Sequence, residues 1–194
     1  MRRFYLPVNI PDFVYWLGVR LLLLYRRIRY GYSFRKIPLT RGKFAIVDQI
    51  DYEKLKNYKW HASKGGHSFY AVHGWRKKDK YFSLPMHRKI IVAPPDKFVD
   101  HINHNGLDNR RANLRIVSPQ QNHWNARKSL GAFTSRYKGV CRKSDKWLAH
   151  IMYLKKNICI GCFDDEESAA KAYDAKAKEL FGEYACLNFP DAAK

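Results

Sequence analysis

The chain has 194 residues, of which 46% are hydrophobic and 15% aromatic, so it can bury one large or two small cores. It carries 37 Lys and Arg residues against 17 Asp and Glu residues, a formal net charge of +20. This excess indicates a polyanionic partner, with nucleic acid ahead of an anionic membrane surface. Charge alone does not indicate which base sequence is bound.

The four cysteines do not predict a disulfide framework, because the chain shows no signal peptide with a small-residue cleavage site. Cys159 and Cys162 form a lone pair, without a second pair or histidines at ligand spacing, which is weak evidence for zinc. We therefore expect core or strand positions for all four cysteines, which are Cys141, Cys159, Cys162 and Cys186.

Residues 1–36 form a basic and apolar N-terminal segment. Its most hydrophobic part, Phe13 to Tyr25, is interrupted by Arg20 and is shorter than the roughly 20 apolar residues that cross a bilayer. We expect a helix that packs on the neighbouring domain or frays, and no stable membrane insertion. The alternative is an amphipathic helix on a membrane surface or along DNA.

Residues 37–96 read as a small β-rich scaffold. Lys43–Asp48 is predicted to be a strand, and Gly65-Gly66 marks a turn into another. The charged run Arg76–Lys80 is predicted to be a hairpin tip. His87 lies near the end of this scaffold; it could border the active site, but we expect it to be structural or to contact phosphate.

The most informative stretch is Val99–Arg127. It opens with Asp100 and His101 at the end of an apolar strand and continues through a polar loop that contains an Asn-Gly turn signal. A second short strand, Leu114–Val117, follows. A capping box with proline at the first helical position then predicts a helix start, at Ser118, Pro119 and Gln121.

This order of strand, loop, strand and helix resembles the HNH endonuclease family, the ββα-metal nucleases. The resemblance implies that Asp100 is a metal ligand and His101 the general base. It makes Asn113 the central residue that ties the loop to the strand pair, and Asn122 the second metal ligand. Asn125, three residues further on, is the alternative to Asn122, and the sequence leaves that choice open.

The residue types suit phosphodiester hydrolysis. A neutral histidine can take a proton from water near neutral pH. A carboxylate and an amide oxygen suit a hard divalent cation, Mg²⁺ or Mn²⁺, which can polarise the phosphate and stabilise the leaving oxygen. They suit a dedicated zinc site poorly.

Residues 129–134 are small and polar and read as a linker. In residues 135–190, three short strands precede a helix that has acids in its first turn and ends at Gly182. The strands are expected at 137–140, 146–151 and 157–161.

The runs YKGV, KWLAHI, GCFDDEESAAKAYDAKA and FGEYACLNFP resemble the AP2 DNA-binding domain over nearly its whole length. The resemblance implies a three-stranded antiparallel sheet that enters the major groove, with one helix packed behind it, and it places Trp147 in the core. The plant members keep arginines and tryptophans at several sheet positions where this chain has other residues, so the fold carries over better than the target sequence. The candidate DNA contacts are Arg136, Lys138, Arg142, Lys143, Lys146, His150, Lys155 and Lys156.

We therefore expect an α+β protein with an HNH nuclease domain at 37–128 and an AP2-like domain at 135–190. Its expected activity is homing-type, metal-dependent cleavage of double-stranded DNA in a bacterial or phage-infected cytoplasm, with no protein partner. The alternative is a sequence-specific DNA-binding regulator with a vestigial nuclease domain. All four family positions hold compatible residues, which favours the nuclease. Target site, nick or double-strand cut, and oligomeric state remain open.

Overall fold

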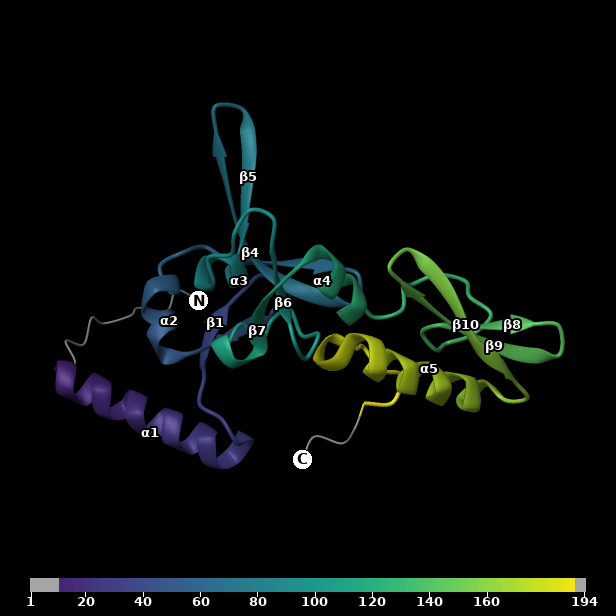
Figure 1. Cartoon of the computed structure of the whole chain (residues 1–194). Coiled ribbons are helices and arrows are strands. Elements are labelled where there is room, and N and C mark those ends of the chain that lie inside the picture. Colours follow the sequence, from purple (N-terminus) through teal and green to yellow (C-terminus); the bar gives the residue numbers. More distant parts are fainter. Residues whose placement is uncertain (1–10, 191–194) are drawn as a thin grey trace.

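The structure is a computed structural model that describes residues 11–190, and these residues form two bodies that meet at helix α4 (Figure 1). The α+β class is confirmed. The N-terminal body contains α1 (Asp12–Tyr30), β1 (Arg35–Pro38), β2 (Phe44–Val47), α2 (Gln49–Leu55), β3 (His61–Gly65), β4 (Ser68–Lys77), β5 (Lys80–Pro85), α3 (Met86–Ile90), β6 (Phe98–His101), a 3-10 turn (Arg111–Asn113), β7 (Leu114–Val117) and α4 (Pro119–Asn125).

Three small antiparallel sheets build the N-terminal body: β1–β2, β3–β4–β5 and β6–β7. One hydrophobic core joins them, and its buried members include Val47, Leu55, Met86, Val99 and Leu114. Because Val99 and Leu114 point into this core from β6 and β7, the hairpin that carries the HNH motif is fixed to the scaffold on one side. Helix α4 contacts both strands of the hairpin, β6 and β7.

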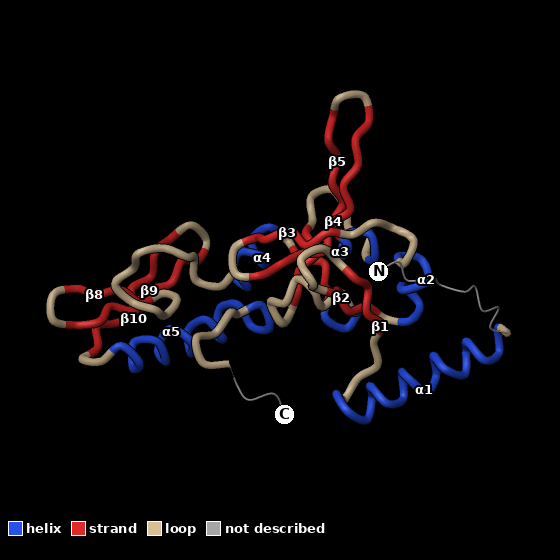
Figure 2. Tube along the Cα trace, turned by 180° about the vertical axis from the view of Figure 1, so that it is seen from behind, coloured by secondary structure: helices blue, strands red, loops and turns tan. Residues whose placement is uncertain are grey.

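The C-terminal body is a three-stranded antiparallel sheet of order β10–β9–β8 with α5 packed on one face (Figure 2). Its elements are β8 (Val140–Lys143), β9 (Lys146–Tyr153), β10 (Lys156–Phe163), α5 (Glu166–Phe181) and a 3-10 turn (Gly182–Tyr184). Asp165 caps α5 by accepting a hydrogen bond from Ser168 N at 2.7 Å. Ala149 and Ile151 of β9 are buried against α5, and Trp147 is half-buried in the same core, as expected.

The first strand of the C-terminal sheet starts later than the sequence indicates. Of residues 137–139, Gly139 still accepts a backbone hydrogen bond from His150 N of β9 at 2.8 Å. Lys138 is bonded elsewhere: its N–H donates to Asn188 Oδ1 at 2.7 Å, and its carbonyl accepts from Asn188 Nδ2 at 3.1 Å. Tyr137 is buried in the same body. The segment therefore ties the C-terminal loop to the sheet, and β8 begins at Val140.

Helix α4 belongs to both bodies. Its Trp124 ring stacks on Phe181 of α5, with ring centroids 4.7 Å apart and planes at 13°. Trp124 also packs against the core cluster that contains Ile151 and Tyr173. The segment expected to be a linker, residues 129–134, therefore runs beside a packed interface between the bodies.

Helix α1 lies at the edge of the N-terminal body and is longer than the apolar run that suggested it (Figure 1). It contacts the body through buried Val19 and through Arg26, whose guanidinium donates to Phe34 O and lies 4.4 Å from the Phe34 ring. Across residues 11–190, no helix has the length and apolar character that a bilayer crossing requires.

The cysteines are unpaired and differ in exposure. Cys186 is buried, Cys141 on β8 is half-buried, and Cys159 and Cys162 are exposed on β10. The expectation of core or strand positions therefore holds, with only Cys186 in the interior.

Candidate active site

The HNH motif folds as strand, loop, strand and helix around one cavity of about 530 Å³. Residues from β4, α3, β6 and α4 line it, among them Tyr70, His87, Asp100, His101, Asn122 and Asn125. The expected capping box is present on α4: Ser118 Oγ accepts from Gln121 N at 3.1 Å, and Ser118 N donates to Gln121 Oε1 at 2.8 Å. This cap fixes where α4 starts and thus which side chains reach the cavity.

His101 is held as a neutral imidazole. It is 5% exposed, and this burial lowers its pKa against the raising effects of Asn109 and Asp100. Its Nε2 lies 3.4 Å from Asn109 Oδ1. With the proton on Nε2, that nitrogen donates to Asn109 and Nδ1 is left as the proton acceptor.

Asn109, which the sequence analysis did not select, is the hydrogen-bond partner of His101. It is fully buried, its N–H donates to Ile46 O at 2.8 Å, and its amide nitrogen donates to Gly106 O at 3.4 Å. Its oxygen is thus aimed at His101 by contacts to the scaffold strand β2 and to the loop. The sequence signal was one more asparagine in the polar loop, after Asn103 and Asn105.

In the Asn-Gly pair of that loop, glycine is needed because the backbone of Gly106 lies close to Tyr70, and not because Gly106 has a left-handed conformation. The positive φ of the loop lies at His104, at 60°. A Cβ on Gly106 would lie 2.5 Å from the Tyr70 ring, and Gly106 N donates to Ser68 Oγ at 2.9 Å. Glycine therefore lets the loop rest on β4, which brings Tyr70 to the cavity.

Asp100 accepts two hydrogen bonds on Oδ2, from Asn125 Nδ2 at 2.7 Å and from Arg115 Nε at 3.2 Å. Asn125 is buried, and its amide is used by Asp100. Asn122 lies one turn earlier on α4 and lines the same cavity. Within residues 11–190 its side chain has no hydrogen-bond partner, so its amide oxygen is available to a ligand.

Asn113 lies outside the cavity and fixes the loop. Its Oδ1 accepts from Asn103 N at 3.0 Å, and its Nδ2 donates to Asp108 O at 2.8 Å. These bonds match the tying role that the family resemblance implies. They give Asn113 no contact with the reacting groups.

Arg115 connects the site to the C-terminal body. It stands directly opposite Asp100 in the β6–β7 pairing. Its Nη1 donates to Glu183 O at 3.1 Å, and its guanidinium lies 4.4 Å from the Tyr184 ring. Its Nη2 is buried with no partner in the part of the chain that the structure describes.

Three further histidines border the cavity, His67, His87 and His104, and two of them have lowered pKa values. The His87 ring meets His101 edge-on at 5.0 Å, and burial, with His101 and Arg88 nearby, lowers the pKa of His87 to about 3. Burial, with Arg127 nearby, also lowers the pKa of His104. Lowered pKa values therefore favour the neutral form of His87 and His104, as they do for His101.

The donor set fits a hard divalent cation. Asp100 offers a carboxylate oxygen and Asn122 an amide oxygen, which are donors that Mg²⁺ and Mn²⁺ accept when water and phosphate oxygens complete the shell. Over residues 11–190, no group of three or more His, Cys, Asp or Glu side chains is placed to hold a metal ion. A site with only two protein donors is consistent with this finding.

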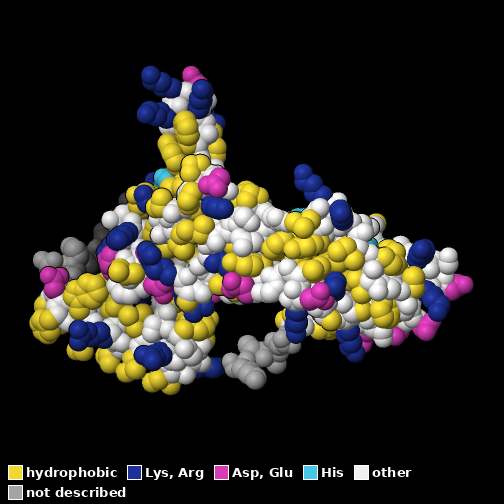
Figure 3. Space-filling view, viewed as in Figure 1, with side chains coloured by type: hydrophobic (Ala, Val, Ile, Leu, Met, Phe, Trp, Pro, Cys, Tyr) yellow, Lys and Arg dark blue, Asp and Glu magenta, His cyan; other side chains and the backbone are white. Residues whose placement is uncertain are grey.

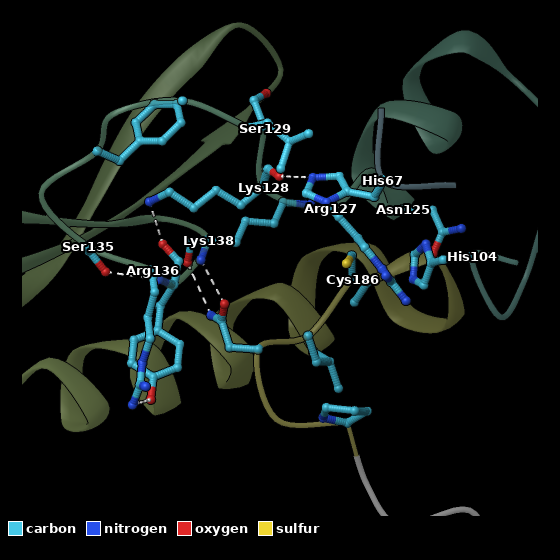
Figure 4. A pocket seen from close by; sticks show the side chains of 18 of the residues that line it. His67, His104, Asn125, Arg127, Lys128, Ser129, Ser135, Arg136, Lys138 and Cys186 are labelled. Atoms are coloured by element: carbon cyan, nitrogen blue, oxygen red, sulfur yellow. Dashed lines mark hydrogen bonds between the residues drawn. The ribbon is translucent and has the colours of Figure 1, made fainter. Parts of the chain in front are cut away.

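A second cavity, of about 1160 Å³, lies between the bodies and continues from the first (Figure 4). The two share His67, His104, Asn125 and Arg127 in their walls. Cations dominate the charge of the second cavity, namely Arg127, Lys128, Arg136 and Lys138. Lys128 and Lys138 already donate to backbone carbonyls, so a polyanionic strand that leaves the nuclease site would meet Arg127 and Arg136.

Lys138 does not fit the DNA contact expected of it. Its ammonium donates to Trp124 O at 2.7 Å and to Ala126 O at 2.6 Å, at the end of α4, and burial lowers its pKa. Figure 4 shows this side chain turned into the space between the bodies. Lys138 thus caps α4 and joins the two bodies.

The other AP2-like candidates divide by sheet face. Because side chains alternate along a strand and β9 buries Ala149 and Ile151 on α5, the pairing register puts Lys143, Lys146 and His150 on the open face. Lys155 and Lys156 are exposed at the β9–β10 turn.

Some of these candidates already have partners. Lys146 pairs with Asp164 at 3.2 Å, and His150 Nδ1 lies 4.0 Å from Cys141 Sγ. Arg142 lies off the open face, 5.0 Å over the Trp147 ring, and Arg136 donates to Tyr137 Oη at 2.7 Å.

Known proteins match both parts of the chain. A family model of HNH endonucleases matches residues 93–124. An uncharacterized HNH endonuclease of Acanthamoeba polyphaga mimivirus is 36% identical over 158 residues, which cover 80% of each chain. No solved structure matches.

Plant transcription factors match a shorter segment. An AP2/ERF and B3 domain-containing protein of Oryza sativa is 44% identical over 61 residues, which are 31% of this chain and 17% of the rice protein. An ethylene-responsive transcription factor of Arabidopsis thaliana is 41% identical over 66 residues, which are 32% of this chain and 36% of that protein. The chain belongs to the HNH endonuclease family, and it adds to the nuclease a segment similar to AP2 domains.

Proposed function

We propose that this endonuclease hydrolyses phosphodiester bonds of double-stranded DNA in a divalent-metal-dependent, homing-type reaction, with His101 as the base and Asp100 and Asn122 as the metal ligands. One observation carries the proposal: a neutral, oriented imidazole lies beside a carboxylate and an unused amide in one cavity. A bound Mg²⁺ or Mn²⁺ would supply Lewis-acid polarisation of the phosphate and charge stabilisation of the leaving oxygen.

The residues of the chain perform the proton transfer. Nδ1 of His101 accepts a proton from the attacking water, and the imidazolium that forms is stabilised by Asn109 on Nε2 and by the nearby Asp100 carboxylate. Asn125 keeps Asp100 oriented through its 2.7 Å hydrogen bond. His87 remains neutral beside His101 and so adds no repelling charge when His101 is protonated.

The C-terminal body is proposed to position the nuclease on DNA. Support comes from its similarity to AP2-containing plant proteins and from the open sheet face that carries Lys143, Lys146 and His150. Phosphate contacts from lysines would supply affinity, and side chains that reach base edges would supply site choice. Arg127 and Arg136, which line the cavity between the bodies, would extend this surface toward the cavity of His101.

Nicking of supercoiled plasmid tests the proposal. The wild-type protein should nick in Mg²⁺ or Mn²⁺ and not in EDTA. His101→Ala should lose at least on the order of 100-fold in rate while it keeps DNA affinity, because the imidazole acts on water. DNA binding without metal-dependent nicking in the wild type would favour the alternative, a DNA-binding regulator with a vestigial nuclease.

A further inference from the structure

The β4–β5 hairpin extends away from the N-terminal body as an isolated two-stranded ribbon (Figures 1 and 2). Strand β3 pairs with β4 only between Ser68 and Val72, whereas β5 pairs with β4 from Val72 to Lys77. Beyond Val72 the ribbon therefore has no third strand. Isolated hairpins are marginally stable in water, so this one needs its own stabilising contacts.

Aromatic rings and a tight turn keep the ribbon formed. The Trp75 ring stacks on His73 and on Phe82 of β5, with centroids 5.6 Å apart in both pairs. On the other face, Tyr81 lies over Gly74, where a Cβ would come within 2.0 Å of the tyrosine oxygen. The tip residues, 78 and 79, both have positive φ, as in the hairpin turns that match strand twist.

The tip is strongly basic and exposed. Figure 3 shows its cations gathered at the end of the projection with one acid among them. The cations of the tip are Arg76, Lys77, Lys78 and Lys80. None of them forms an ion pair with a residue in the range 11–190. Exposed cations without ion-pair partners at the end of a projecting ribbon can bind a polyanion through charge.

We propose that this ribbon is a DNA-contacting finger that lies in the major groove, with its tip lysines against phosphates. The major groove, about 12 Å wide, admits a two-stranded β-ribbon. The inference rests on the proposed DNA cleavage, because it uses the same duplex. Tyr70 of β4 borders the active site, and Lys77 is seven residues further along the same strand.

This geometry sets the reach of the finger. At about 3.3 Å per residue, seven residues place the tip roughly 23 Å from the nuclease cavity, or about seven base pairs along the duplex. The finger would therefore contact DNA well beside the cleaved bond. The AP2-like body leaves the nuclease at α4, on another side of the N-terminal body (Figure 1).

The test compares two full-length variants that lose the same charge. The finger variant is Lys77→Ala, Lys78→Ala and Lys80→Ala. The control variant changes exposed lysines on α2, after α2 and on α5, namely Lys54→Ala, Lys59→Ala and Lys171→Ala. Affinity for a labelled DNA duplex of mixed sequence is measured over a series of salt concentrations, and circular dichroism confirms the fold of each variant.

Each lost phosphate contact lowers the slope of log K against log salt by about 0.9, so the finger variant should lose about 2–3 from that slope. Its affinity at 0.1 M salt should fall on the order of 100-fold. The control variant should keep most of the wild-type slope. A finger variant with arginine at all three positions should bind like wild type, because charge and not lysine itself is used.

The outcomes separate this inference from the proposed function. If the finger variant and the control variant have equal slopes, the finger does not touch DNA, and wild-type nicking would still support the nuclease. If wild-type protein neither binds nor nicks DNA, the proposed function itself fails.

Discussion

Arg115→Met should destabilise the metal-free protein and make its stability depend more strongly on Mg²⁺. Arg115 Nε lies 3.2 Å from Asp100 Oδ2, and the two side chains are only 13% and 12% exposed. Removing one partner of such a pair costs about 3–5 kcal/mol, because the other charge stays buried without compensation. Asn125 still donates to Asp100, so we expect the lower end, about 3 kcal/mol, and a Tm lower by about 6–12 °C.

A cation on Asp100 would replace the lost guanidinium charge. The Mg²⁺-induced rise in Tm should therefore be larger in Arg115→Met than in the wild type, since binding to the folded state alone stabilises it. Thermal unfolding over a Mg²⁺ series measures both shifts. The double variant Asp100→Asn, Arg115→Met removes both charges and should show a smaller loss and little Mg²⁺ response. Equal Mg²⁺ shifts in wild type and Arg115→Met would refute the reasoning.

Other variants separate the roles of neighbouring residues. Asn125→Ala should cost about 1–3 kcal/mol in metal-free urea unfolding, because buried Asp100 loses a donor. Asn122→Ala should leave stability within about 0.5 kcal/mol but raise the Mg²⁺ concentration needed for half-maximal nicking; the opposite pattern would exchange the two roles. Lys138→Met should lower Tm and leave DNA affinity unchanged, because the Lys138 ammonium bonds to the end of α4. A loss of DNA affinity at unchanged Tm would instead show that Lys138 contacts DNA. Burial lowers the pKa of His87 to about 3, so the unfolded chain binds a proton below pH 6.5 that the folded chain refuses until about pH 3. Between about pH 6 and pH 3 this difference should remove about 1.4 kcal/mol of stability per pH unit on acidification, and His87→Gln should reduce the measured slope by that amount; an unchanged slope would contradict the lowered pKa of His87.

Local signals in the sequence were sufficient for the parts of the site that lie close together in the chain. The capping box at Ser118 predicted the start of α4, and the apolar residues before Asp100 predicted the strand that carries Asp100 and His101. The acidic first turn and Gly182 marked α5 within a few residues. Each of these features is decided by neighbours within one helical turn or one strand.

Long-range contacts explain what the sequence could not indicate. Arg115 meets Glu183 across 68 positions, and nothing near either residue predicts the other. Lys138 has the appearance of a surface lysine in sequence, but the end of α4 offers it two carbonyls. The choice between Asn122 and Asn125 also depended on folding, because only the packed helix shows which amide Asp100 already uses.

The stacking of Trp124 on Phe181 bears on how this chain can be recombined. A chimera that exchanges the C-terminal body at residues 129–134 would leave the indole without its stacking partner and Arg115 without Glu183 and Tyr184. A segment that could be exchanged without loss of these contacts would therefore have to begin before Arg115 and α4, inside the HNH motif. Two sequences that look like separable modules would then be inherited as one piece, and a new DNA specificity would more readily arise by substitution on the open sheet face than by domain replacement.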